Sequence, residues 1–169
     1  MGILRALLAG VLALGATATS QAASYRIRPL DALPGQKDVY ALGVNDAQHA
    51  VGYVIDADGR RRAAVWDPAG LTLLPPLASG QSSWAFRVNN HDQIVGKVAL
   101  ADGSQHAALW ENRSLRDLGT LPGGKNSFAA DINELGVVAG SSEAAVGSSA
   151  FTWTADAGFQ AFGATDPPL

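Results

Sequence analysis

The sequence contains no cysteine, so neither a disulfide nor a thiolate metal site can hold the fold together. Charge is also sparse: Asp, Glu, Lys and Arg make up 16% of the 169 residues, and the 12 basic residues form no long run. This pattern lacks the electrostatic footprint of a nucleic-acid-binding protein or of a polybasic membrane-surface patch, so we expect neither partner. What is abundant is glycine, with 19 residues, beside 47% hydrophobic residues. That combination is typical of one modest, turn-rich β domain.

Residues 1–23 have the pattern of a cleaved signal peptide. Arg5 supplies a positive start, the next stretch is rich in Leu and Ala, and Ser20 and Ala22 are small residues at the positions that a signal peptidase reads. The alternative is a membrane anchor, but the apolar run is shorter than the roughly 20 residues that a bilayer requires. We therefore predict a signal peptide helix cleaved near Ala22 and Ala23, a mature chain without a membrane span, and a secreted or periplasmic location.

The main signal is an internal repeat, because shifting the chain by 44 residues superimposes it on itself. From this period we predict a β-repeat domain over 24–169, with a lone strand at 25–33 followed by repeats at about 39–77, 83–121 and 127–162. The positions that coincide are Asn45, Asn89 and Asn133; Gly52, Gly96 and Gly140; and Trp66, Trp110 and, one residue early, Trp153.

Each unit is expected to form four short strands. In the first strand, apolar residues alternate, which predicts Tyr40, Leu42 and Val44 on one face. The repeated glycine of the second strand indicates a bulge or a close neighbouring backbone that excludes a Cβ. The pairs Asp58-Gly59 and Asp102-Gly103 predict hairpins before the third strand, and the fourth strand is the weakest.

Four strands in about 44 residues is the size of one β-propeller blade. The predicted fold class is therefore all-β, with three tandem four-stranded repeats in a partial or open propeller-like arrangement. A β-trefoil-like or β-prism-like threefold arrangement is the alternative, because three units of this size can close by themselves. Three blades and a surplus strand leave an open sheet edge, so we expect self-association through the open repeat edges.

Several segments resemble the HAF family of bacterial extracellular repeat proteins. They are the Asp-Leu-Gly-Thr-Leu run at 117–121, the pair Ile132-Asn133 followed by Val138-Ala139-Gly140, and His106-Ala107-Ala108-Leu109-Trp110. The units depart from the family pattern, since only the second keeps the His and only the third has the Phe, as Phe151. The resemblance implies a secreted, propeller-like repeat protein and supplies no activity.

The repeated residues are interpreted as structural. Trp66, Trp110 and Trp153 could be sugar-stacking platforms, but equal placement at the end of an apolar strand favours packing between units. The repeated asparagines end a strand before a tight loop, where the side chain can cap its own backbone.

Other motifs have ordinary interpretations. Residues 119–126 resemble a phosphate-binding loop but lack the following helix, so we predict a connecting loop. Residues 56–59 resemble the start of a calcium loop, but arginines follow, so we predict a hairpin. His49, His91 and His106 have no metal-ligand spacing and are expected on the surface.

The sequence therefore predicts an exported, non-catalytic β-repeat protein that acts as a binding or surface-scaffold module. The alternatives are a carbohydrate-binding, lectin-like module and a propeller-type enzyme acting on extracellular glycans. No catalytic residue, metal site or cofactor is indicated. An extracellular ligand or glycan is expected where equivalent loops differ, at 35–38, 79–83 and 123–126.

Overall fold

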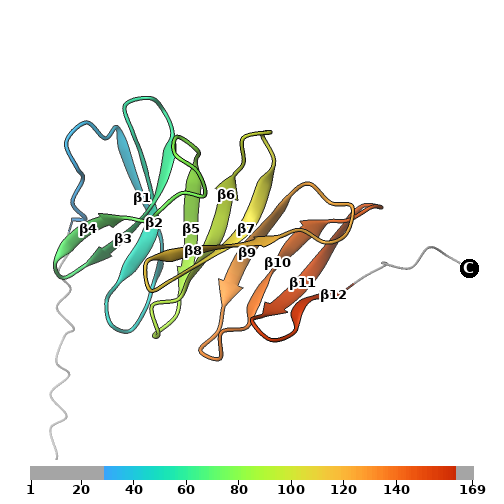
Figure 1. Cartoon of the computed structure of the whole chain (residues 1–169). Helices are drawn as coiled ribbons and strands as arrows, with labels where there is room; N and C mark the ends of the chain where they lie inside the picture. Colours follow the sequence, from blue (N-terminus) through green and yellow to red (C-terminus); the bar gives the residue numbers. More distant parts are fainter. Residues whose placement is uncertain (1–28, 163–169) are drawn as a thin grey trace, which may run out of the picture.

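The computed structural model describes residues 29–162, and in that range the chain forms twelve strands and no helix (Figure 1). The strands make three four-stranded antiparallel sheets, each built from consecutive strands in sequence order. The first sheet contains β1 (Asp38–Val44), β2 (Ala50–Ile55), β3 (Arg61–Asp67) and β4 (Gly70–Leu73). The second contains β5 (Ser83–Val88), β6 (Ile94–Ala99), β7 (Gln105–Glu111) and β8 (Ser114–Gly119). The third contains β9 (Ser127–Ile132), β10 (Val138–Glu143), β11 (Ser148–Thr154) and β12 (Gly158–Phe162).

The sheets follow one another in an open series, and the all-β prediction is confirmed. Strand β5 packs against β1, β2 and β3, and β9 packs against β5, β6 and β7, so each sheet uses its first strand to meet the sheet before it. This is the open, propeller-like arrangement, and the closed threefold alternative is not what forms. Within residues 29–162, no helix is long and apolar enough to cross a membrane.

The predicted lone strand at 25–33 is wrong where it can be checked. The signal peptide at 1–23 and residues 25–28 lie outside the described residues, and residues 29–33 form no strand. Pro29 lacks the N–H that a strand ladder requires. The segment is nevertheless anchored, because Trp66 Nε1 donates to the carbonyl oxygen of Asp31 at 2.8 Å. Exactly one period later, Trp110 Nε1 donates to the carbonyl of Pro75 at the same distance.

The repeated glycines sit beside a β-bulge in each sheet, as the sequence predicted. The register of β1 on β2 shifts between Ala41 and Gly43, and similar shifts occur in the other two sheets. A Cβ on Gly52 would overlap the carbonyl oxygen of Tyr40, and a Cβ on Gly96 would overlap that of Trp84. Glycine is therefore required because the neighbouring backbone occupies the space of a side chain.

The same bulge overturns the predicted face of the first strand. Tyr40 pairs with Tyr53 and Val44 pairs with Ala50, so the two side chains lie on opposite faces of the sheet. The extra residue in the bulge reverses the alternation, which a strict period of two cannot anticipate. In the second sheet the bulge brings Val88 onto the face of Ala85, where both are buried.

Two cores lie between neighbouring sheets, and a third, with Val54, Ala64 and Trp66, contains residues of the first sheet alone. One core joins Val51 and Ala63 of the first sheet to Ile94 and Trp110 of the second. The next core joins the second sheet to the third. All three repeated tryptophans are buried. Trp110 and Trp153 pack between sheets, as predicted, whereas Trp66 packs against residues of its own sheet.

Candidate functional site

The three sheets are tied together at the edge that carries the β1–β2, β5–β6 and β9–β10 turns, called here the turn edge. The side-chain amide of Asn45 donates to the carbonyl of Asn89 at 3.0 Å, and that of Asn89 donates to the carbonyl of Asn133 at 3.0 Å. Each asparagine also accepts from a backbone N–H four residues on, which closes its own turn. The predicted turn cap is therefore present, and the ladder between units is an addition that the sequence did not reveal.

Pairs of a histidine and an acidic side chain at the turn edge also bridge neighbouring sheets. Nδ1 of His49 lies 2.7 Å from Oδ1 of Asp92, which joins the first sheet to the second. Nδ1 of His91 lies 3.4 Å from Oε2 of Glu134, which joins the second sheet to the third.

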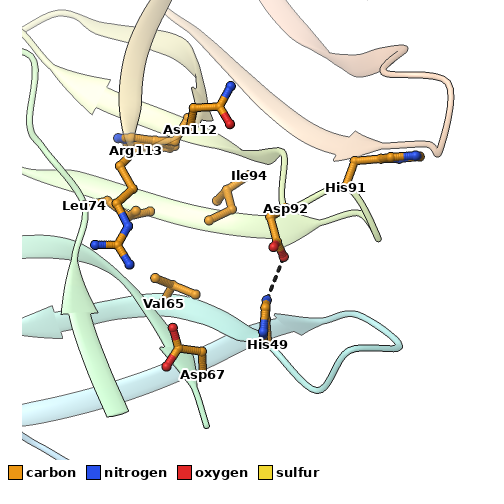
Figure 2. A pocket seen from close by; sticks show the side chains of 10 residues that line it. His49, Val65, Asp67, Leu74, His91, Asp92, Ile94, Asn112 and Arg113 are labelled. Carbon is orange, nitrogen blue, oxygen red and sulfur yellow. Dashed lines mark hydrogen bonds and ion pairs between the residues drawn. The ribbon is translucent and has the colours of Figure 1, made fainter. Parts of the chain in front are cut away.

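A cleft of about 260 Å³ opens at the turn edge between the first and second sheets (Figure 2). Its floor is apolar and contains Val65, Leu74 and Ile94, while polar and charged groups surround the opening. The cleft is slightly smaller than ordinary ligand pockets, which begin at about 300 Å³, so it suits a ligand of about one sugar or amino acid. The polar and charged lining residues are His49, Asp67, His91, Asp92, Asn112 and Arg113.

The polar groups of the cleft come from four turns or strand ends. Asp67 ends β3, and its Oδ1 accepts from the backbone N–H groups of Ala69 and Gly70 in the following turn. Asp92 lies in the β5–β6 turn, where Oδ1 meets both His49 and the amide of Asn45. In both carboxylates Oδ2 has no hydrogen bond within residues 29–162, so each offers an acceptor to a ligand.

Arg113 is held in an unusual backbone conformation at the opening. Asn112 and Arg113 form the two-residue β7–β8 turn with φ values of 50° and 61°, both in the left-handed region. Figure 2 shows the Arg113 side chain reaching past Leu74 toward Val65 and Asp67. The ionisable side chains of the cleft are two carboxylates, two imidazoles and one guanidinium. The arrangement can both accept and donate hydrogen bonds over an apolar floor.

The expected surface position holds for only one of the three histidines. The His91 side chain is 66% exposed, but those of His49 and His106 are 24% and 20% exposed, and each contacts an aspartate. The sequence did not predict the partial burial of His49 and His106, because the aspartates that they contact lie on a neighbouring sheet or strand. No group of three His, Asp or Glu side chains suited to a metal ion comes together in the described range.

The resemblance of residues 119–126 to a phosphate-binding loop has a structural explanation. Oε2 of Glu143 accepts from the backbone N–H groups of Lys125 and Asn126 at 3.1 Å, and Oε1 accepts from the Asn126 amide at 2.9 Å. The Asn126 amide and the Lys125 N–H hold the pKa of Glu143 below its ordinary value. The loop therefore binds an anion, but that anion is a carboxylate of the same chain.

The loops at 35–38, 79–83 and 123–126 lie at the edge opposite the turn edge, away from the cleft. They precede β1, β5 and β9 and lie beside the β2–β3, β6–β7 and β10–β11 turns. The second of these loops leads to Trp84, whose ring lies 4.7 Å from Nζ of Lys97. Burial, with a smaller effect from Arg61, lowers the pKa of Lys97.

Residues 56–59 form the predicted hairpin, because Oδ1 of Asp56 accepts from two N–H groups of its own turn.

His106 and Asp117, two of the motif residues in the second unit, lie within ion-pair distance of each other. Nδ1 of His106 on β7 lies 2.9 Å from Oδ1 of Asp117 on β8, which also accepts from the N–H of Gly119. The first unit has Arg62 and Leu73 at these positions, and the third has Ser149 and Ala161. The two residues are therefore present together or absent together within this chain.

Sequence reasoning missed Asp67, Asp92 and Arg113 as residues of one site. They occupy different positions of the repeat, so superimposing the units separates them. The available signal was the absence of glycine from the β7–β8 turn, where a tight turn normally requires it. Comparisons with protein-family models, with curated proteins and with solved structures find no match to this chain.

Proposed function

We propose that this chain is an exported, non-catalytic β-repeat module that binds a small ligand in the cleft between its first two sheets. The observation that supports this is a difference between equivalent positions. In the second sheet Gln93 donates to Glu111 at 2.7 Å, so the two side chains satisfy each other. The equivalent residues of the first sheet are His49 and Asp67, which have no bond to one another and border the cleft instead. Polar groups left facing a concave site are those that a ligand can use.

Export is part of the proposal and is supported by the leader pattern at 1–23. The full chain, expressed in a bacterium, should lose about 22 or 23 residues and leave the cytoplasm. Mass spectrometry of the mature chain checks this. If the protein keeps its N-terminus and stays in the cytoplasm, the proposed export is wrong, but the proposed ligand binding is unaffected.

Binding is tested by recording amide NMR spectra of the mature chain with a panel of sugars, amino acids and dipeptides. A ligand of the cleft should shift the amides of Asp67, Asp92 and Arg113. The variant Asp92→Ala removes the carboxylate and should weaken binding, whereas Asp58→Ala, in an exposed turn outside the cleft, should not. Shifts confined to the opposite edge would place the ligand elsewhere and contradict the proposal.

One observation favours a second candidate, an enzyme acting on extracellular glycans. A histidine oriented by an aspartate, as in the His49–Asp92 pair, is an arrangement that general bases use. Turnover of a glycan substrate that His49→Gln abolishes would establish this candidate. Binding without turnover across a panel of such substrates would establish the non-catalytic function.

A further inference from the structure

The β7–β8 turn has a strained backbone conformation that the equivalent turns of the other two sheets avoid by using glycine. Asn112 and Arg113 both adopt positive φ, whereas the turns that lead into β4 and β12 place Gly70 and Gly158 in that region. A side chain in the left-handed conformation is disfavoured, and two-residue turns of this type prefer glycine in the second place. Strain that persists at the opening of a cleft is a reason to look for a role of the strained side chain.

The guanidinium of Arg113 is available for such a role. The ion pairs within residues 29–162 involve His49, Arg60, His91 and His106, and Arg113 makes none. Asp67 borders the same cleft but lies beyond ion-pair distance of it. A planar group with five N–H donors therefore faces a carboxylate across the cleft without contacting it.

From these observations, and resting on the proposed binding function, we infer that the ligand is polyhydroxylated: a neutral sugar residue at the end of a glycan, selected by Arg113. Sugar hydroxyls both donate and accept, so one ring can accept from Arg113 and donate to Asp67 and Asp92. The C–H face of the ring lies on Val65 and Ile94. The two carboxylates, Asp67 and Asp92, disfavour an acidic sugar, and the volume admits about one ring.

The test compares Arg113→Gly with wild type, using an array of neutral and uronate-bearing oligosaccharides and calorimetry with the best-bound neutral one. Glycine relieves the turn, so the variant should unfold about 2–6 °C higher than wild type. It should also bind the neutral oligosaccharide at least roughly tenfold more weakly, because hydrogen bonds to a charged donor are lost. Arg113→Lys keeps the charge but not the planar fork and should recover little of the affinity. Arg60→Ala, an exposed arginine outside the cleft, is the matched control and should bind as wild type does.

The outcomes separate this inference from the proposed function. Loss of affinity together with a gain in stability supports it, since a merely structural arginine would not give both. Wild-type affinity in Arg113→Gly, or a preference for uronates, overturns it. Binding of an amino acid or a dipeptide in the NMR panel, but of no glycan, leaves the proposed function standing and overturns the sugar assignment. Binding of none of these probes overturns both.

Discussion

At the scale of single residues, the repeated glycines act within a sheet and the repeated asparagines act between sheets. Gly96 lets the bulged strand β5 lie against β6, where any Cβ would overlap the carbonyl of Trp84. Asn89 is buried and both closes its turn and donates to the third sheet. The glycine is required because it has no side chain, whereas the asparagine acts through both the oxygen and the nitrogen of its side-chain amide.

Gly96→Ala should be far more costly than Gly103→Ala in the same unit. The first adds a methyl group where backbone already lies, which we expect to lower the free energy of unfolding by about 3 kcal/mol or more. Gly103 has φ +87° but open space around it, so alanine there costs only the left-handed conformation, about 1–2 kcal/mol. Urea unfolding of the two variants measures the difference. Equal losses would show that the backbone at Gly96 yields easily.

Asn89→Ala should destabilise the protein more than Asn133→Ala. Both lose the turn cap, for about 1 kcal/mol, but only Asn89 is buried and also loses the bond to the next unit. We expect about 2–4 kcal/mol for Asn89→Ala by denaturant unfolding. Identical effects of the two substitutions would mean that the ladder adds nothing to stability.

At the scale of the element, strands and loops are fixed by contacts that recur only in part between units. The His106–Asp117 pair ties β7 to β8 in the second unit alone, and Glu143 organises the loop before β9 in the third alone. Each of these contacts is present in one unit and adds to the sheet structure that all three units share.

The β7–β8 pair can be measured with residues that the chain itself uses. Replacing His106→Ser and Asp117→Ala introduces the residues of the third unit at the same positions. A double-mutant cycle should give a coupling of about 0.5–1 kcal/mol, because both side chains remain partly exposed. Strict additivity of the two substitutions would show that the pair contributes nothing beyond its separate residues.

The loop before β9 should depend on pH through Glu143. Its pKa lies below the ordinary value of 4.5 in the folded protein, so its stabilising effect is present above that value and is lost as pH falls through the folded pKa. Glu143→Gln should therefore be less stable than wild type at neutral pH, and the difference should shrink below about pH 4. Thermal unfolding between pH 3 and 7 measures this. A difference that is constant with pH would contradict the role of the charge.

How far the sequence predicts each element follows from what the repeat preserves. The period located the strands and the buried tryptophans, because each unit has the same strands and buries its Trp, Trp110 and Trp153 between sheets and Trp66 within the first sheet. The bulge reversed the face of Val44 and Val88, since one extra residue changes every later side chain. The cleft was not predictable, because it depends on residues that the units do not share.

At the scale of the whole molecule, the two ends of the series differ. Val44 is 68% exposed, whereas its equivalents Val88 and Ile132 are 8% exposed because a preceding sheet covers them. At the other end, the outer face of the third sheet has Ala139 and Thr152 where the second sheet has Val95 and Leu109. The first end exposes Val44 on β1, while the last end has small or polar residues on β10 and β11 but exposes Phe128 on β9 and Phe162 on β12.

Self-association stays a prediction, and we expect it through the first sheet, because Val44 is more exposed than Phe128 or Phe162 at the other end. Sedimentation at micromolar concentration should show a dimer that Val44→Lys dissociates. Phe162→Lys, at the other end, serves as the matched control and should leave the dimer intact. A strict monomer, or a dimer that only Phe162→Lys dissociates, would contradict this assignment.

The asparagine ladder has a consequence for how such a chain can change in length. Each rung runs from a side chain to the backbone of the equivalent residue in the next unit, so it makes no demand on which side chains follow. A duplicated 44-residue segment inserted between two units would find its donor and its acceptor already in place. Gene duplication could thus lengthen or shorten the array by whole units while every rung of the ladder is kept.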